Sequence, residues 1–370
     1  MLIGVPKEIK NRENRVGLTP ESVQELIAAG HQVLVESHAG QGINASNDNY
    51  IMAGAVIASN ATEIFSQAKM IVKVKEPQAV ERAMLREGQL LFTYLHLAPD
   101  AEQTKDLVAS GATCIAYETI TCASGALPLL APMSEVAGRM SIQAGSHVLE
   151  KTQGGRGMLL GGVPGVASAK VVVIGGGVVG SNAVQMALGA RADVTVLDRS
   201  KQALVHLDQE FGGAVKTVYS NKAALEKHVS EADLVIGSVL IPGATAPKLV
   251  TKEMVAGMKR GAVLVDVAID QGGCFATSYA TTHEEPTYEV DGVMHYCVAN
   301  MPGGVPLTST YALNNATLPY VMKLANQGWH QALAGDKYFL AGLNVHAGQV
   351  TNVHVAEALG YQYVDPALVY

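Results

Sequence analysis

A glycine-rich run between two apolar segments is the most informative chemical feature of the chain. Four β-branched residues, Val171 to Ile174, lead into Gly175-Gly176-Gly177-Val178-Val179-Gly180. Gly175 permits a tight turn out of a strand, Gly177 permits a diphosphate to approach the backbone, and Gly180 permits a helix to pack closely on the sheet. The first amides of that helix are free to donate, and its N-terminus is partly positive. The pattern predicts a dinucleotide diphosphate at this turn.

A carboxylate follows the glycine run at the distance expected for a ribose ligand. A second apolar run, Val194 to Leu197, ends on Asp198, 18 residues after Gly180. A carboxylate there accepts from both ribose hydroxyls and repels a 2′-phosphate, an effect that the adjacent Arg199 weakens slightly. We therefore predict NAD rather than NADP as the cofactor; the alternative is a strand–helix–strand turn that binds no nucleotide.

Four ionisable residues outside the glycine run could supply the rest of a reaction. Arg15 lies in a loop after the first expected strand. Lys75 and His96 each follow an apolar run, and Asp270 follows another. Ligands of open α/β sheets gather at the carboxyl ends of strands. An arginine and a lysine bind a carboxylate, a histidine transfers a proton near neutral pH, and a carboxylate stabilises an iminium or orients water. Together they fit an oxidoreductase that acts on an amino or hydroxy acid.

Taken one at a time, these four residues also have structural interpretations. Arg15 could be a solvated loop charge. Lys75 shares one strand face with Lys73, so that one of the two lysines could be solvated. His96 could be a hydrogen-bonded imidazole at a strand end, and Asp270 could cap the glycine turn that follows it.

The elements that must position these residues alternate between short apolar strands and amphipathic helices, which predicts an α/β fold with two Rossmann-like, doubly wound domains. Thr19 and Pro20 mark a helix start. A helix is expected over residues 131–151 and a glycine-rich loop over 154–165. Further strands are expected at Met1–Val5, Gln32–Glu36, Met70–Val74, Leu90–Tyr94, Thr113–Ala116, Leu234–Ile236, Val263–Asp266 and His295–Val298, with later helices over Ser309–Leu324 and Trp329–Leu340.

The two domains are expected to divide the chemistry between them. Residues 1–128 lack a phosphate-binding glycine turn, which favours a substrate domain. We expect this domain to be discontinuous and to include residues 306–370, with the nucleotide-binding domain inserted at 129–305. The active site is then expected in the cleft between the domains.

Composition excludes several other classes of protein. The chain has 370 residues, of which 48% are hydrophobic and 16% charged, which is typical of compact α/β proteins. A net charge of −7 without a basic block argues against nucleic acid as a partner. No apolar run is long enough for a membrane span, and the N-terminus lacks the apolar segment of a signal peptide. Four scattered cysteines predict reduced thiols in the cytoplasm, and no spacing of possible ligands predicts a metal site.

Five blocks of sequence resemble the family of alanine dehydrogenases and nicotinamide nucleotide transhydrogenases. They extend from residue 4 to beyond residue 300, in the family's order. The blocks are GVPKEIKNRENRVGLTP (4–20), GMLLGGVPGV (157–166), VVVIGGGVVG (171–180), DVAIDQGGCF (266–275) and YCVANMPGGVP (296–306).

This resemblance implies a cytoplasmic homohexamer that interconverts L-alanine with pyruvate and ammonia using NAD. Arg15 and Lys75 would bind the substrate, His96 would be the general acid/base and Asp270 the second catalytic residue. Ala203 stands where the family often has a basic residue, and Lys201 or Arg199 could replace that contact. The implied NAD contacts are Ser134, Gly175, Gly177, Val178, Val179, Gly180, Asp198, Ser220, Val239, Leu240, Val267, Asp270, Val298, Asn300 and Met301.

Three other functions compete with this interpretation. A transhydrogenase-type subunit would bind NAD without an amino acid, and it is expected to continue into a linker, whereas this chain stops at Tyr370. A protein that only senses NAD would not need the four ionisable residues. A dehydrogenase for glycine, glyoxylate or a larger amino acid would differ in the packing around Tyr94, Met133 and Met301.

Overall fold

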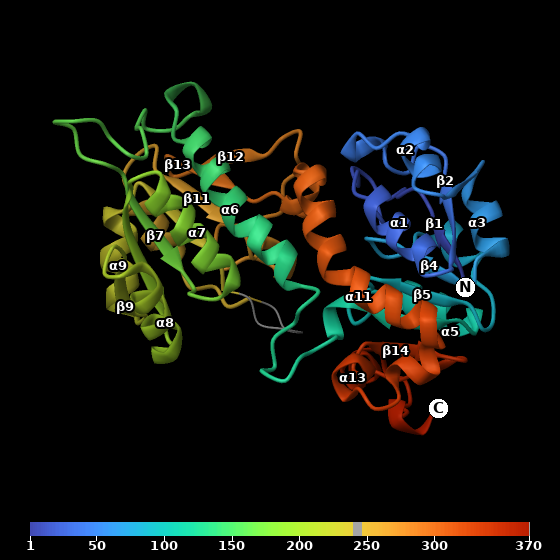
Figure 1. The fold of residues 1–370 in the computed structure, drawn as a ribbon. Helices are drawn as coiled ribbons and strands as arrows, with labels where there is room; N and C mark the ends of the chain where they lie inside the picture. The colour runs from blue at the N-terminus through green and yellow to red at the C-terminus, as the bar shows by residue number, and fades with distance from the viewer. Residues whose placement is uncertain (240–245, 370) are drawn as a thin grey trace. The chain divides into compact units, whose positions relative to one another are not determined.

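The computed structural model describes residues 1–239 and 246–369, which form two compact α/β units (Figure 1). Unit 1 comprises residues 1–133 and the chain from Val305 onward, and unit 2 comprises Ser134–Gly304. Each unit contains one largely parallel sheet flanked by helices. The prediction of two doubly wound α/β domains is therefore confirmed.

The sheet of unit 1 has the order β15-β14-β6-β5-β4-β1-β2-β3. Strands β1 to β6 are parallel to their neighbours, whereas β14 and β15 add an antiparallel edge. The chain moves outward from β1 in one direction and returns to start again at β4, so the switch point of the sheet lies between β1 and β4. The strands are β1 (Leu2–Val5), β2 (Gln32–Glu36), β3 (Val56–Ala58), β4 (Met70–Val72), β5 (Leu90–Thr93), β6 (Thr113–Ala116), β14 (Leu343–His346) and β15 (Gln349–Val350).

The helices of unit 1 begin where local sequence signals place them. Thr19 caps the first helix by accepting a hydrogen bond from the amide of Ser22, with Pro20 at the first helical position, as predicted. The expected break between the two late helices occurs as a kink at Gly328, which has a positive φ of 74°. The helices are α1 (Pro20–Ala28), α2 (Asn47–Met52), α3 (Ala61–Gln67), α4 (Ala79–Arg82), α5 (Ala101–Ser110), α11 (Pro306–Leu333), α12 (Lys337–Leu340) and α13 (Val353–Leu359).

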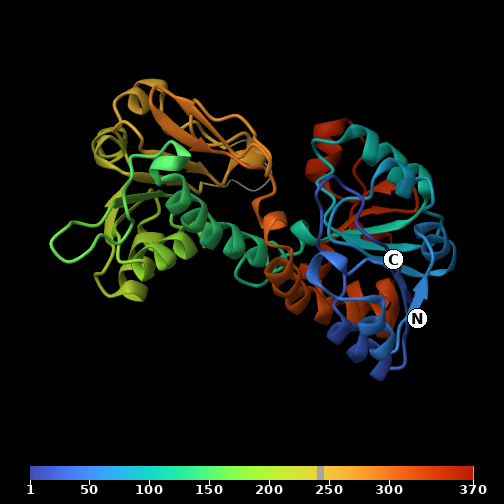
Figure 2. The ribbon, with the colours of Figure 1, turned by 90° about the horizontal axis from the view of Figure 1, so that it is seen from above.

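The C-terminal part of the chain returns to the N-terminal sheet. Figure 1 and Figure 2 show the last segments, drawn in orange and red, beside the blue and teal strands of unit 1. Strand β14 pairs antiparallel with β6, so the C-terminal part of the chain extends a sheet whose other strands, apart from β15, come from the N-terminal part.

The sheet of unit 2 has the order β12-β13-β11-β10-β7-β8-β9, with its switch point between β7 and β10. All neighbouring strands are parallel except the hairpin of β12 and β13. The strands are β7 (Lys170–Ile174), β8 (Asp193–Asp198), β9 (Lys216–Tyr219), β10 (Leu234–Gly237), β11 (Val263–Asp266), β12 (Thr287–Val290) and β13 (Val293–Tyr296). The helices are α6 (Ala131–Val148), α7 (Val178–Gly189), α8 (Lys201–Phe211), α9 (Lys222–Glu231) and α10 (Lys252–Ala256).

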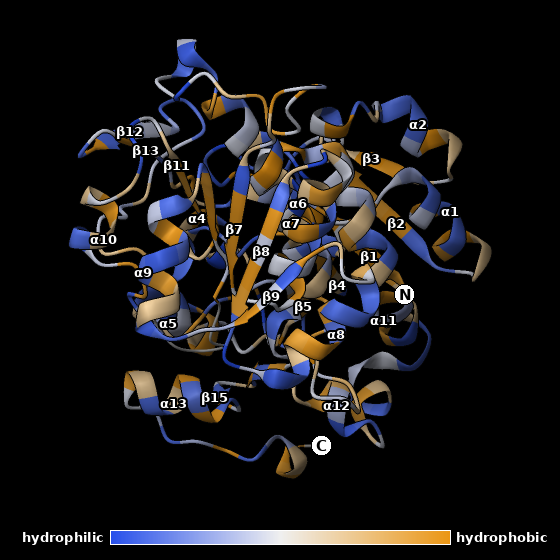
Figure 3. Ribbon diagram, turned by 90° about the vertical axis from the view of Figure 1, so that its left-hand side faces the viewer, coloured by the Kyte–Doolittle hydropathy of each residue, from blue (hydrophilic) through white to orange (hydrophobic). Residues whose placement is uncertain are grey.

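Small residues let α6 pack closely within unit 2. A Cβ atom at Gly138 would lie 2.9 Å from the Cβ of Asn182 and closer still to the carbonyl oxygen of Val179 in α7. A Cβ atom at Gly145 would lie 2.7 Å from a methyl group of Leu234 in β10. The central strands β7 and β8 that these helices cover are largely hydrophobic (Figure 3).

One expected strand is misplaced. The strand predicted over His295–Val298 exists as β13, but it runs over Val293–Tyr296, so its predicted bounds are wrong by two residues. Asp291 and Gly292 both have positive φ, 52° and 81°, which is the geometry of a tight hairpin turn, so β13 begins directly after them. Val298 leaves the ladder and forms only an isolated bridge with Thr281.

Candidate functional site

Three of the predicted site residues follow adjacent strands of unit 1. Arg15 lies in the loop after β1, Lys75 lies three positions beyond β4, and His96 lies three positions beyond β5. Because β1, β4 and β5 are parallel neighbours, their following loops leave the same edge of the sheet, at its switch point. The sequence prediction that these residues follow strand ends agrees with this placement.

Arg15 is buried and held by the carboxylate of Glu13. Its Nε donates to Glu13 Oε1 at 2.6 Å and its Nη2 donates to Glu13 Oε2 at 2.5 Å, a bidentate arrangement. Its Nη1 donates to the sulfur of Met133 at 3.1 Å. Burial by itself lowers the pKa of Arg15, but the hydrogen bonds and charge of Glu13 outweigh it and the pKa is raised. The guanidinium is thus charged and fixed in orientation.

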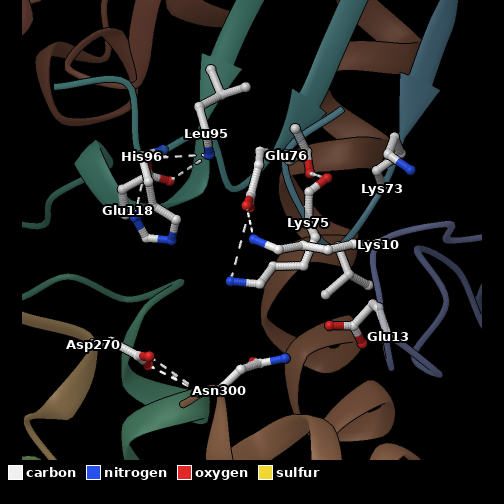
Figure 4. A network of polar contacts seen from close by, with 12 residues as sticks. Lys10, Glu13, Lys73, Lys75, Glu76, Leu95, His96, Glu118, Asp270 and Asn300 are labelled. Carbon is white, nitrogen blue, oxygen red and sulfur yellow. Dashed lines mark hydrogen bonds and ion pairs between the residues drawn. The ribbon is translucent and has the colours of Figure 1, made fainter. Parts of the chain in front are cut away.

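Lys75 belongs to a second group of charges, which includes Glu76 and Lys10 (Figure 4). Its Nζ lies 3.8 Å from Glu76 Oε2, while Lys10 Nζ donates to the other oxygen of that carboxylate. Burial raises the pKa of Glu76, but Lys75 and Lys10 outweigh it and lower the pKa. The Glu76 carboxylate is therefore ionised between two lysines.

The neighbouring Lys73 has a different environment from Lys75. Its side chain is completely buried, and its Nζ donates to Glu8 at 3.0 Å and to Glu81 at 2.7 Å. Glu8 also accepts from the backbone amides of Val74 and Lys75. Of the two lysines that sequence could not separate, Lys73 is therefore a structural ion-pair partner, and Lys75 is partly exposed.

His96 is held in place by Glu118. The residue has a positive φ of 50°, which is uncommon for residues other than glycine, although histidine is one of the types that adopt it more often. Its backbone amide donates to Glu118 Oε1 at 2.6 Å, and its ring Nδ1 lies 3.9 Å from the same oxygen. The imidazole stacks on Tyr94 with the ring planes 7° apart, and 46% of its side chain is exposed. The ring is oriented and also accessible, as a proton-transfer group must be.

The glycine run of unit 2 has the geometry that its spacing predicts. Gly175, directly after β7, has a positive φ of 105°. Gly177 precedes α7, and a Cβ atom there would meet nothing within 4 Å. A Cβ atom at Gly180 would lie 2.9 Å from the carbonyl carbon of Gly175 and closer still to its oxygen. The run therefore combines a tight turn at a glycine with positive φ, an open face above the N-terminus of α7 and a close helix–turn contact.

Asp198 ends β8 beside this turn. One carboxylate oxygen accepts from the amide of Gly176 at 2.6 Å, and the other accepts from the amide of Ser200 at 2.6 Å. The carboxylate is thereby fixed next to the glycine run. Ala203 lies in the first turn of α8, where its amide donates to the Ser200 hydroxyl.

Asp270 lies in the short 3-10 helix Ile269–Gln271, after β11. Both of its carboxylate oxygens accept from the backbone amide of Asn300, at 3.1 and 3.3 Å (Figure 4). Asn300 itself has a positive φ of 54°. The contact joins the loop after β11 to the loop after β13.

The remaining predicted cofactor positions lie in helices or after strands of unit 2, apart from Leu240, which lies outside the described residues. Ser134 lies in α6, and Val178 and Val179 lie in the first turn of α7. Val298 and Met301 have buried side chains, whereas 46% of Val178 is exposed. Ser220 follows β9, Val239 follows β10, Val267 follows β11, and Val298, Asn300 and Met301 follow β13.

Sequence reasoning missed the carboxylates that hold the candidate residues. Glu13 binds Arg15, Glu76 contacts Lys75, and Glu118 binds His96. Glu13 and Glu76 are close in sequence to the cations they bind, which is a usable signal. Glu118 is 22 positions from His96, and only the parallel pairing of β5 with β6 brings it near.

Over residues 1–239 and 246–369, no group of three or more His, Cys, Asp or Glu side chains could hold a metal ion. Within the same ranges no helix is long and apolar enough to cross a membrane.

Two family models match the chain. The model described as the N-terminal domain of alanine dehydrogenase/PNT matches residues 4–137. The model described as the C-terminal domain of alanine dehydrogenase/PNT matches residues 141–353. Together they include all four predicted catalytic and substrate-binding residues.

Curated relatives and solved structures match over nearly the full length. Alanine dehydrogenase of Halomonas elongata is 61% identical over 99% of this chain and 99% of that protein. Alanine dehydrogenase of Mycolicibacterium smegmatis is 54% identical, with the same shares covered. A solved L-alanine dehydrogenase has a TM-score of 0.94 and 52% identity over 97% of this chain and 99% of that chain. A transhydrogenase from Sinorhizobium meliloti has a TM-score of 0.82 and 26% identity over 95% and 99%. The chain belongs to the alanine dehydrogenase/PNT family.

Proposed function

We propose that the protein is an NAD-dependent L-alanine dehydrogenase, which converts L-alanine reversibly to pyruvate and ammonia. The observation that carries this proposal is the 61% identity to an alanine dehydrogenase over 99% of both chains. The placement of Arg15, Lys75 and His96 after adjacent strands of one sheet supports it. In this proposal unit 1 is the substrate domain and unit 2 is the nucleotide-binding domain.

The substrate carboxylate is bound by Arg15 and Lys75 in this proposal. A guanidinium held by Glu13 offers a fixed direction of hydrogen bonding, and an ammonium offers a point charge. Lys75 is better suited to this role than Lys73, because the ammonium of Lys73 is already paired with two buried carboxylates.

The nucleotide is held by the glycine run and Asp198. The family and the Rossmann-like fold of unit 2 imply a nicotinamide cofactor. The open face at Gly177 and the fixed Asp198 carboxylate fit a diphosphate and a ribose with free hydroxyls, which supports NAD over NADP. The backbone amides at the start of α7 would bind the diphosphate, and bound NAD would accept the hydride that leaves the α-carbon of alanine.

His96 moves the protons of the reaction in this proposal. Oxidation of the amino acid leaves an iminium, which water attacks. His96 takes the proton of that water, and the resulting carbinolamine loses ammonia to give pyruvate. Glu118 holds the histidine backbone and faces its Nδ1, so the opposite nitrogen is the one presented for proton transfer. Asp270 keeps the polar groups around the reacting carbon in place.

We further propose that the protein works in the cytoplasm as a homohexamer. Its four cysteines are free thiols, which fits a reducing compartment. The hexamer follows from the family resemblance, and light scattering coupled to size-exclusion chromatography would measure it directly.

The activity is tested by following NADH formation from NAD with L-alanine, glycine, L-serine and L-valine, and NADH consumption with pyruvate and ammonium. L-alanine is expected to give the highest kcat/KM, and NADP in place of NAD is expected to be a poor acceptor. If none of the four amino acids reduces NAD, the protein is a nucleotide-binding protein and the proposal is wrong.

A further inference from the structure

The carboxylate of Glu76 has no role in the proposed mechanism, yet it lies between two lysines, one of which is a proposed substrate ligand. Glu76 is mostly buried, and it pairs with Lys10 through one oxygen and with Lys75 through the other. Among the described residues, Glu76 Oε2 has no hydrogen-bond donor within bonding distance, although Lys75 lies 3.8 Å away. Glu76 therefore subtracts charge from Lys75 without taking up all of its hydrogen-bonding capacity (Figure 4).

The charges of this group match a substrate with one carboxylate. The loops after the adjacent strands β1 and β4 carry the cations Arg15, Lys10 and Lys75, with Glu13 and Glu76 as their anionic partners. These five side chains together carry one net positive charge. A single substrate carboxylate neutralises that charge, whereas a second carboxylate would be an unpaired anion near the largely buried carboxylate of Glu76, which is costly.

The buried cluster of Lys73, Glu8 and Glu81 adds to this preference for a single carboxylate. Behind Lys75, the buried Lys73 is bound by both Glu8 and Glu81, so this group has an excess of carboxylates. Glu8 accepts from the backbone amide of Lys75 itself. Burial is the main cause that raises the pKa of Glu8; the charge of Glu81 also raises it, and Lys73 opposes the shift.

We propose that Glu76 determines the charge class of the substrate. It cancels one positive charge beside Lys75, so that an α-keto acid or amino acid with one carboxylate is accepted and a dicarboxylic one is rejected. This inference rests on the proposed function, since it takes Lys75 as a substrate ligand.

The test compares two α-keto acids of similar shape and different charge. Oxaloacetate carries a second carboxylate, and α-ketoisocaproate has an uncharged isobutyl group of nearly the same size. The kcat/KM for NADH consumption with ammonium is measured for both acids in the wild type, in Glu76→Gln and in Glu76→Asp. We expect Glu76→Gln to raise the ratio of oxaloacetate to α-ketoisocaproate by on the order of tenfold, because it removes one nearby negative charge. Glu76→Asp keeps the charge and is expected to keep the wild-type ratio.

A matched control removes a carboxylate elsewhere in unit 1. Glu102 pairs with Arg82 at 3.6 Å but is largely exposed, so Glu102→Gln is expected to leave the ratio unchanged. An unchanged ratio in Glu76→Gln, with both constants lowered together, would mean that Glu76 only supports the loop, and the inference would be wrong.

The outcome for the proposed function is read separately. A wild type that consumes no NADH with pyruvate and ammonium contradicts the proposed function. In that case the affinities for oxaloacetate and α-ketoisocaproate are measured by calorimetric titration into the protein with NADH, and their ratio replaces the ratio of kcat/KM values. If Glu76→Gln does not change this ratio of affinities, the inference is wrong.

Discussion

A single methyl group at Gly180 should damage nucleotide binding more than it damages the helix that carries it. In the wild type, α7 approaches the turn after β7 so closely that a Cβ atom at Gly180 would lie 2.9 Å from the carbonyl carbon of Gly175. It would also lie 3.1 Å from the hydroxyl of Ser238. Both neighbours are fixed, because the Ser238 hydroxyl donates to the carbonyls of Ile174 and Gly175. Gly180→Ala must therefore push the turn and the helix apart.

Two opposing effects set the size of the change in stability. Overpacking against a rigid neighbour costs about 1–3 kcal/mol. Alanine in a helix interior regains about 1 kcal/mol relative to glycine. The net loss in the free energy of unfolding is therefore expected to be about 0–2 kcal/mol, measured by urea denaturation. The affinity for NADH, measured by titration of its fluorescence, is expected to fall by at least about tenfold, because the displaced turn carries the amides that are proposed to bind the diphosphate.

Gly189 provides a control in the same helix. It ends α7, and a Cβ atom there would meet nothing within 4 Å. Gly189→Ala is expected to leave NADH binding unchanged and to be neutral or stabilising. If Gly180→Ala binds NADH as tightly as the wild type, the close contact does not shape the nucleotide site and the reasoning from spacing to diphosphate binding fails.

Three further substitutions test other parts of the structure. Lys73→Met should cost about 3–5 kcal/mol of unfolding free energy because two buried carboxylates lose their cation, whereas Lys170→Met, at an exposed ion pair, should leave the unfolding free energy near that of the wild type in the same urea assay. His96→Ala should lower kcat by about a hundredfold to ten-thousandfold while NADH affinity stays near that of the wild type; near-normal turnover would exclude the acid/base role. Burial raises the pKa of Asp336, but hydrogen bonds from backbone amides and from Lys323 outweigh burial, and the pKa in the folded protein is lowered. The Asp336 carboxylate therefore stabilises the fold above the pKa that it has in the unfolded chain, and this stabilisation is lost as pH falls through the lower pKa of the folded state. In Asp336→Asn the melting temperature should lack this part of its dependence on acidic pH. If the melting temperatures of both proteins depend on pH in the same way, the Asp336 carboxylate does not stabilise the fold as argued.

Local signals predicted most of the fold because they act within a few residues. The cap at Thr19, the glycine turn at Gly175 and the apolar runs of β2, β6 and β11 each specify their own element. The error at β13 came from neglecting a local signal of the same kind. Asp291-Gly292 is a strong hairpin dipeptide, and it fixes the register of β12 and β13 directly.

The candidate site was predicted less completely because its geometry depends on contacts that are distant in sequence. Arg15, Lys75 and His96 could be identified as candidate site residues because each follows an expected strand. Their orientations could not, because each depends on a carboxylate, and Glu118 reaches His96 only after β5 and β6 have paired. The same limit applies to Lys73, whose burial becomes visible only when Glu8 and Glu81 are brought to it.

The two units carry different chemical groups at the same place in the same kind of sheet, which fits the proposed division between a substrate domain and a nucleotide-binding domain. In unit 2 the switch point lies beside a glycine turn, and the backbone amides of α7 can bind a diphosphate without any charged side chain. A small amino acid offers only one carboxylate and one nitrogen, so backbone amides alone would discriminate it poorly from other anions. In unit 1 the corresponding loops instead carry long cationic side chains, and Arg15 and Lys75 each have an acidic partner. Such pairing fixes the direction and the net charge of the cations, which are the two quantities that a site for a small zwitterion must control.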